Sequence, residues 1–262
     1  MGILNVTPDS FADGGKHYKV SDALNRAKEM IDEGVDIIDI GGESTKPGAE
    51  RVTEDEEAAR VLPVLEQVIP LGVEVSIDTT RSAIAAKAIK LGVKYVNDVS
   101  GGLADPNMYE LIAQNPKVQY VIMHWRAHSK DMQEHALYKD VVKEVKEELE
   151  ARIDSAIEAG VNPEQIIIDP GLGFSKMPDH NWELLKNLDR IALLGYPILV
   201  GASRKRFLGE LTGATNPDDR EAASIAVTAM VAKLNVWGVR THSVKPHRDA
   251  IATVERFSKS RV

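Results

Sequence analysis

Short runs rich in β-branched residues alternate along the whole chain with longer stretches of helical periodicity, and this alternation limits the possible folds more than any other feature. A repeated strand–helix unit is typical of a parallel sheet, because parallel strands require a crossover connection. Strands are predicted at residues 2–6, 35–40, 73–77, 94–99, 118–123, 165–168, 197–200 and 236–240. Helices are predicted after them at residues 21–33, 53–69, 81–91, 106–114, 138–159, 181–194, 218–234 and 247–258.

Eight strand–helix units in 262 residues predict an α/β protein with the (β/α)₈ architecture of a TIM barrel. No linker or abrupt change in composition divides the chain, so residues 1–262 are predicted to form a single domain. The alternative is an open, doubly wound sheet. It is less favoured because no dinucleotide-binding glycine motif follows the first strand and no P-loop motif occurs in the chain.

Several helix ends carry their own sequence signals. Ser21 and Thr53 are expected to act as N-caps, and Thr53 is expected to form a capping box with Glu56. The glycines expected just past helix ends are Gly34, Gly92 and Gly160.

Composition excludes several classes of partner. The chain has 40 acidic and 32 basic residues and a formal net charge of −8, so it has no overall field that would attract nucleic acid. It has no cysteine, which is typical of a reducing compartment. The first residues do not resemble a signal peptide, and no apolar stretch is long enough for a membrane span. We therefore expect a cytoplasmic globular protein with no nucleic-acid or membrane partner.

Polar side chains follow every predicted strand at the point where it ends. In a barrel the carboxyl ends of the strands meet at one mouth, so these side chains are expected to converge. An aspartate after a strand is often only a helix cap, but polar groups at all eight ends are harder to explain in that way. They are Asn5, 41–45, Asp78, Asn97, Asp98, His124, Arg126, Asp169, 203–206 and 240–242.

The cations in this set indicate an anionic ligand. Lys205 and Arg240 come from the ends of the last two strands, where barrels often bind phosphate, and Arg126 and Arg206 are further candidates. The alternative for residues 204–206 is a solvated surface run.

The acidic and amide groups indicate a second kind of ligand. Asp78, Asn97 and Asp169 offer hydrogen-bond acceptors, which suits a flat heterocycle with several N–H donors. A general acid–base pair is the alternative.

Histidine spacing does not predict a metal site, because no His-Glu-x-x-His motif is present. A hard cation held mainly by substrate phosphate, with oxygens from Asn5 and from Asp9 or Asp13, is more plausible. Two loops rich in glycine and proline, at residues 6–20 and 43–52, are expected to act as lids over the mouth.

These residues occur in motifs whose order and register resemble those of the dihydropteroate synthases, folate-pathway enzymes of the pterin-binding (β/α)₈ family. The resemblance covers nearly the whole chain, and residues 123–126 are similar to the actinobacterial branch. The motifs are residues 2–11 with 13–15, 41–48, 76–79, 96–99, 169–174 and 201–207.

The resemblance implies a pterin-methyl transferase in which 6-hydroxymethyl-7,8-dihydropterin diphosphate and p-aminobenzoate give 7,8-dihydropteroate and pyrophosphate. It implies Mg²⁺ as the cofactor, with Asn5 as a metal ligand. The catalytic residues that it implies are Asp13, Lys205, Arg240 and His242. The substrate-binding residues that it implies are Phe11, Thr45, Pro47, Asp78, Asn97, Met123, Asp169, Phe174, Gly201, Lys205, Arg240, Thr241 and His242.

Within this set the resemblance assigns Asp78, Asn97, Asp169 and Lys205 to the pterin. It assigns Thr45 to the diphosphate, and Arg240 and His242 to an anion site. It places Phe11, Pro47 and Phe174 around p-aminobenzoate.

The resemblance also implies a sulfonamide target and a homodimer formed through the C-terminal helices, which the apolar run at residues 222–234 would suit. Two alternatives stay open: a catalytically silent paralogue that binds pterin, and a methyltetrahydrofolate-type methyltransferase.

Three departures from the family pattern stand out. The chain opens inside the first strand, so a less tightly closed barrel floor is expected. Ser243 replaces an aspartate, which puts the orientation of His242 in question. The turn after Phe174 reads Ser-Lys-Met in place of Gly/Ala-Lys-Thr.

Overall fold

The computed structural model describes residues 1–7, 20–44, 48–128 and 130–259, and every strand pair within them is parallel. Six strands form one sheet in chain order, and the last two form a second sheet. All the predicted strands are present, with ends that differ by at most two residues. They are β1 (Gly2–Asn5), β2 (Ile37–Gly41), β3 (Glu74–Asp78), β4 (Tyr95–Asp98), β5 (Gln119–Met123), β6 (Ile166–Asp169), β7 (Leu199–Val200) and β8 (Gly238–Val239).

Isolated parallel bridges join the two sheets at both edges. Ile168 pairs with Ile198, which connects β6 to the segment before β7, and Gly2 pairs with Thr241, which connects β1 to the segment after β8. The first residue takes part as well, because the Met1 amine donates to the carbonyl of Val239 at 2.9 Å. Backbone contacts therefore run around the whole ring, and the fold is a (β/α)₈ barrel. A less tightly closed barrel floor was expected here. In the structure, Met1 takes part in the backbone contacts between β1 and the region of β8.

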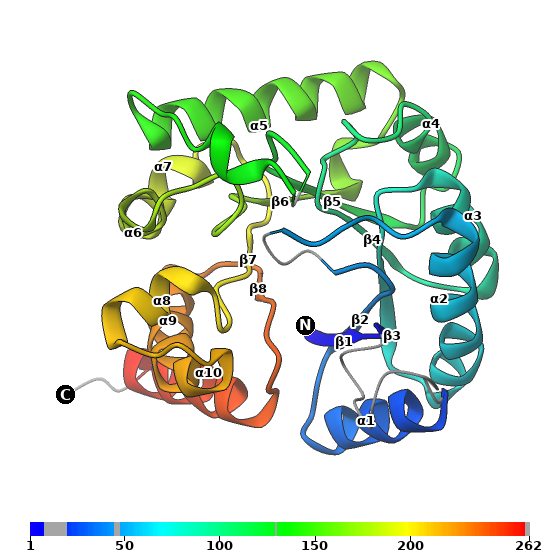
Figure 1. The fold of residues 1–262 in the computed structure, drawn as a ribbon, viewed down its shortest axis with the longest axis horizontal. Coiled ribbons are helices and arrows are strands. Elements are labelled where there is room, and N and C mark those ends of the chain that lie inside the picture. The colour runs from blue at the N-terminus through cyan, green and yellow to red at the C-terminus, as the bar shows by residue number, and fades with distance from the viewer. Residues whose placement is uncertain (8–19, 45–47, 129, 260–262) are drawn as a thin grey trace.

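The helices form an outer layer around the strands (Figure 1). No helix in the described part of the chain is long and apolar enough to cross a membrane. The helices are α1 (Val20–Asp32), α2 (Glu54–Val68), α3 (Ser82–Leu91), α4 (Met108–Ala113), α5 (Val141–Glu158), α6 (Pro178–Lys186), α7 (Leu188–Ala192), α8 (Arg206–Thr212), α9 (Glu221–Lys233) and α10 (Lys245–Lys259).

Two helix predictions are wrong. The single helix expected at residues 181–194 is divided into α6 and α7, because Asn187 leaves the helical conformation and its side-chain amide donates to the carbonyl of Glu183 at 2.8 Å. The sequence did not predict α8 at all. This helix has seven residues, too few to show an amphipathic period, and it ends at Gly213 with a φ of 72°.

The helix-end predictions are confirmed in part. The Oγ1 of Thr53 accepts from the backbone N–H of Glu56 at 3.2 Å. The glycines Gly34, Gly92 and Gly160 have φ values of 83°, 114° and 96°, as expected past helix ends. Ser21 is not an N-cap, because α1 begins at Val20 and Ser21 lies in its first turn.

Strand alternation places the polar residues inside the ring. In β2, Ile38 and Ile40 belong to the large apolar cluster between sheet and helices, so Asp39 and Gly41 face the barrel interior. The same alternation turns Asp78 inward, since Ile77 packs outward. Below this polar level, a separate small cluster fills the barrel with Val121, Ile167 and Leu199. The barrel is therefore apolar at one level and polar at its carboxyl end.

Candidate active site

Strand register brings the predicted polar residues together in two groups at the carboxyl ends of the strands. Gly41 at the end of β2 pairs with Asp78 of β3, and Asp78 pairs with Asn97 of β4. On the other side Met123 of β5 pairs with Asp169 of β6. These side chains come from elements far apart in the sequence and share the carboxyl mouth of the barrel, as the sequence predicted.

Arg240, just past β8, is held by carboxylates from two other strands. Its Nε donates to Asp39 Oδ2 at 2.6 Å and its Nη2 to Asp78 Oδ2 at 2.7 Å. Asn97 Nδ2 also donates to Asp39 Oδ2, at 3.0 Å. Burial raises the pKa of Asp78 to about 7, and the nearby charge of Arg240 opposes that rise. The Asp78 carboxyl group can therefore change its charge near neutral pH.

A second charged pair lies at the ends of β6 and β7. Burial raises the pKa of Asp169, and the charge of Lys205 opposes this. Burial lowers the pKa of Lys205 to about 8, and the charge of Asp169 opposes that shift. Gly201 lies beside both: a Cβ there would be 3.7 Å from Asp169 Oδ2 and 3.8 Å from Lys205 Nζ. A methyl group there would be in ordinary van der Waals contact with both, so the glycine backbone lies close to the two charged groups.

Lys205 also touches the loop after β6. Its amine donates to the carbonyl of Leu172 and lies 4.7 Å from the ring centre of Phe174, a cation–π contact. This places Phe174 at the rim of the polar level.

A neutral hydrogen-bond donor, the imidazole of His242, follows β8. Burial lowers the pKa of His242 to about 3, with the charge of Arg240 acting in the same direction, so the imidazole is neutral. Its Nδ1 is 3.0 Å from Ser203 Oγ, and its backbone N–H donates to the same oxygen at 3.2 Å. With the Ser203 proton directed at Nδ1, the imidazole proton sits on Nε2 and can be donated to an anion.

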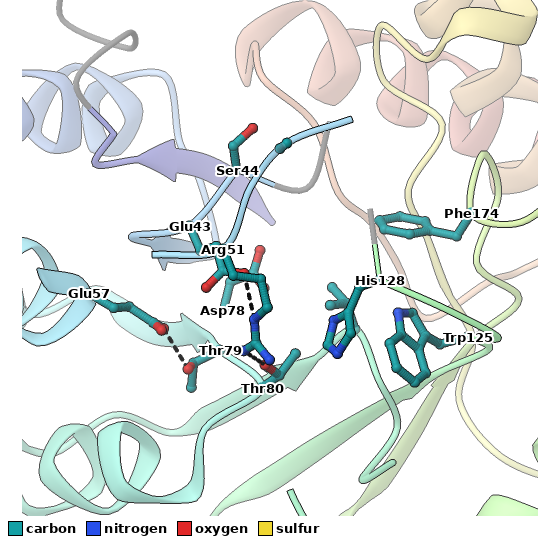
Figure 2. A pocket seen from close by; sticks show the side chains of 12 residues that line it. Glu43, Ser44, Arg51, Glu57, Asp78, Thr79, Thr80, Trp125, His128 and Phe174 are labelled. Carbon is teal, nitrogen blue, oxygen red and sulfur yellow. Dashed lines mark hydrogen bonds and ion pairs between the residues drawn. The ribbon is translucent and has the colours of Figure 1, made fainter. Parts of the chain in front are cut away.

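A pocket opens beside this layer (Figure 2). Phe174, Trp125 and His128 lie on one side, and Asp78 lies on the other, near Arg51. The ring centres of Trp125 and His128 are 4.8 Å apart. An aromatic wall facing a carboxylate suits a planar ligand that carries hydrogen-bond donors.

Comparison with known proteins agrees with this geometry. The profile of the family described as pterin binding enzymes matches residues 1–242. The chain belongs to this family.

Its relatives include the dihydropteroate synthase of Mycobacterium leprae, 46% identical over 260 residues that cover 97% of this chain and 91% of the relative. A solved structure of Xanthomonas albilineans dihydropteroate synthase with 4-aminobenzoic acid has a TM-score of 0.93 and 39% identity, covering 99% of this chain and 93% of that one. A Yersinia pestis dihydropteroate synthase solved as a sulfonamide drug complex has a TM-score of 0.92 and 36% identity, covering 99% and 94%.

The structure places most of the family-derived site residues around the mouth. Met123 is buried at the end of β5 and packs with Phe174, and Thr241 Oγ1 donates to the carbonyl of Ser243 at 3.0 Å. Asn5 lies at the end of β1, level with Gly41. Four of the implied residues lie outside the described part of the chain: Phe11, Asp13, Thr45 and Pro47.

Two further candidate cations are engaged elsewhere. Arg126 pairs with Glu144 and Glu148 of α5, and Arg206 pairs with Glu210 on the exposed surface of α8. Of the four cations singled out from the sequence, Lys205 and Arg240 therefore belong to the site, and Arg51, which the sequence did not single out, lines the pocket beside Asp78.

The departure at Ser243 does not leave His242 without orientation. Ser243 Oγ donates to Glu221, away from the ring, while Ser203 holds the imidazole as described above. The substituted turn adopts an unusual conformation, because Ser175 has a φ of 47°.

Sequence reasoning missed several residues around the site. Asp39 lies within an apolar strand, and a charge in the middle of such a run was the available signal. Glu57 is buried in α2, where it accepts from Thr79 Oγ1 at 2.6 Å and pairs with Arg81. Trp125 carried no comparable signal, since nothing in an aromatic residue near a strand end distinguishes a ligand wall from core.

Proposed function

We propose that this chain is a dihydropteroate synthase that joins 6-hydroxymethyl-7,8-dihydropterin diphosphate to p-aminobenzoate and releases pyrophosphate. The observation that carries the proposal is the group of buried Asp78, Asn97 and Asp169 at the mouth of the barrel, with the partly exposed Lys205 and Arg240 beside them. The similarity to dihydropteroate synthases along almost the full length of both chains supports it.

The buried polar level suits the pterin ring. When Asp78 and Asp169 are ionised they only accept hydrogen bonds, which matches the ring N–H and amino groups, and Lys205 donates to ring oxygen or nitrogen. Because Asp78, Asn97 and Asp169 are buried, their contacts with a ligand are stronger than contacts at the surface. The ring is thereby bound in one orientation, with its exocyclic methylene toward the mouth.

The chemistry follows from charge placement. The bond between the methylene carbon and the diphosphate oxygen breaks, and positive charge spreads from that carbon into the ring. Asp78 and Asp169 favour this cation, while Arg240 and the Nε2–H of His242 stabilise the departing anion. The neutral arylamine then forms the new carbon–nitrogen bond and loses a proton to water, so positioning carries the rate in place of a strong base.

Mg²⁺ belongs to the proposal as well. Among the described residues no group of three or more His, Asp, Glu or Cys could hold a metal ion by itself. One amide oxygen, from Asn5, fits a hard cation whose other ligands are diphosphate oxygens and water. When bound, the cation would neutralise charge on the leaving diphosphate.

The test is release of pyrophosphate by the purified chain with both substrates and Mg²⁺, with 7,8-dihydropteroate identified by mass. Reactions without p-aminobenzoate, and with Lys205→Ala, are the controls. Tight pterin binding without turnover would instead favour a silent paralogue. Methyl transfer from methyltetrahydrofolate would favour the other alternative.

A homodimer through the C-terminal helices is also proposed. Met230 on α9 is 64% exposed and Phe257 on α10 is 74% exposed, which is unusual for side chains of this size and suits an interface. Light scattering should give twice the mass of the chain, and Met230→Glu should shift the protein toward monomer. A cytoplasmic location, small-molecule substrates and sulfonamide binding complete the proposal.

A further inference from the structure

Asp39 is a fully buried carboxylate in the middle of β2, and its side chain faces the barrel interior. One oxygen, Oδ2, accepts from two partners: Arg240 Nε at 2.6 Å and Asn97 Nδ2 at 3.0 Å. The other oxygen, Oδ1, is buried and has no hydrogen-bond partner among the described residues. The carboxylate therefore lies directly beneath two groups of the candidate site.

A buried carboxylate fills the interior of a barrel at a high cost in desolvation free energy. Taking the charge out of water costs several kcal/mol, and an apolar residue of similar volume is often as stable. The barrel interior accepts apolar side chains elsewhere, as Val121 of β5 and Ile167 of β6 show. What distinguishes Asp39 is its effect on Arg240 and Asn97.

Asp39 determines which end of the Asn97 amide faces it. A primary amide has a donor end and an acceptor end of nearly equal size, and either end can face a given direction. An ionised carboxylate only accepts, so it draws the Nδ2 end of Asn97 toward Asp39. The Oδ1 end is then presented on the opposite side of the amide, where a ligand N–H can donate to it.

Asp39 also helps to fix the plane of the Arg240 guanidinium. Asp39 holds the Nε edge and Asp78, from the next strand, holds Nη2 at 2.7 Å. A planar guanidinium bound at two positions by carboxylates of different strands cannot rotate about its stem without losing one of them.

We propose that Asp39 is a positioning residue that determines the orientation in which the site binds a pterin. It orients the Asn97 amide with its oxygen toward the ligand, and it fixes the plane of the Arg240 guanidinium. Asp39 itself does not touch the substrate. This inference rests on the proposed function, and it adds to that function a residue that decides ligand orientation.

The experiment is calorimetric titration of Asp39→Asn with 6-hydroxymethylpterin, beside the wild type. Asparagine keeps the size but removes the charge, so the preference of Asn97 for one amide orientation is lost. We expect the dissociation constant to rise about 10- to 100-fold, as for loss of hydrogen bonds to a charged group. The KM for p-aminobenzoate should stay unchanged. Asp39→Ser is titrated in parallel, so that misfolding of one variant does not decide the result.

Asp98 supplies a matched control. It is an equally buried aspartate at the end of β4, but it faces away from the site, where Ser100, Gly102 and Tyr120 donate to it. Asp98→Asn should lower the melting temperature and leave pterin affinity as in the wild type. In an Asn97→Ala background the effect of Asp39→Asn should shrink about threefold or more, because part of it acts through Asn97.

The outcomes separate two failures. Wild-type pterin affinity in folded Asp39→Asn and Asp39→Ser would overturn the positioning role while leaving the synthase proposal intact. Full additivity with Asn97→Ala would also overturn it. Failure of the wild-type protein itself to bind the pterin would overturn the proposed function and this inference together.

Discussion

The Nζ atom of Lys176 lies 2.9 Å from Nδ1 of His124, and both side chains are buried. The amine also donates to the carbonyls of Gly171 and Phe174, each at 3.0 Å. Because Nδ1 accepts, the imidazole proton is on Nε2, which donates to Glu148 at 2.9 Å. One lysine thus ties the loop after β6 to β5 and, through His124, to α5.

Lys176→Met should loosen that loop. Methionine fits the space, but it leaves two carbonyls and one imidazole nitrogen without their donor, so we expect a loss of about 2–4 kcal/mol of unfolding free energy. Because Phe174 is on the same loop, the KM for p-aminobenzoate should rise more than that for the pterin. Chemical denaturation and steady-state kinetics measure both effects. Lys186→Met, on the exposed end of α6, is the control and should change neither.

Asp169→Asn should abolish tight pterin binding. Its Oδ1 accepts from the backbone N–H of Gly171 at 2.7 Å, a contact that asparagine can keep. The other position then carries an amide donor facing the donor edge of the ring, so the dissociation constant should rise about 100-fold. If Asp169 served only to cap the turn, calorimetry would find wild-type affinity.

Lys205 should give pterin binding an alkaline limit. With a pKa of about 8 in the free protein, the amine is charged below that value and loses its proton as the pH rises through it. Affinity should therefore fall from pH 7 to pH 9. In Lys205→Ala, affinity at pH 7 should be lower by about 1.5–3 kcal/mol, and the step near pH 8 should be absent, which leaves only the change that Asp78 contributes near pH 7. A step near pH 8 that persists in the variant contradicts the assignment.

His242 should remain neutral in the folded protein well below its ordinary range. Burial and the charge of Arg240 lower its pKa to about 3, so its ring resonances should not titrate between pH 8 and pH 5. The unfolded chain takes up this proton near pH 6.5, whereas the folded protein does not. The free energy of unfolding should therefore decrease as the pH falls from about 6.5 toward 3. Histidine NMR titration is the measurement. A midpoint for His242 above pH 6 would show that the anion site uses a cationic imidazole.

The amino-acid sequence by itself determined where the strands lie and which residues end them. Asp78, Asn97 and Asp169 could be placed at one mouth because side-chain alternation and the common direction of parallel strands are local and topological rules. Those rules need no knowledge of which atoms meet. They also failed where an element was too short to show a period, as with α8.

Only the tertiary structure decided how these residues are held. Asp39 meets Asn97 across 58 residues and Arg240 across 201, and no periodicity links positions so far apart. Lys176 looked like one residue of a variant turn until its amine was seen among two carbonyls and His124. Burial shifts a pKa, and partners orient an amide or an imidazole, through distances of about 3 Å that exist only once the ring of strands has closed.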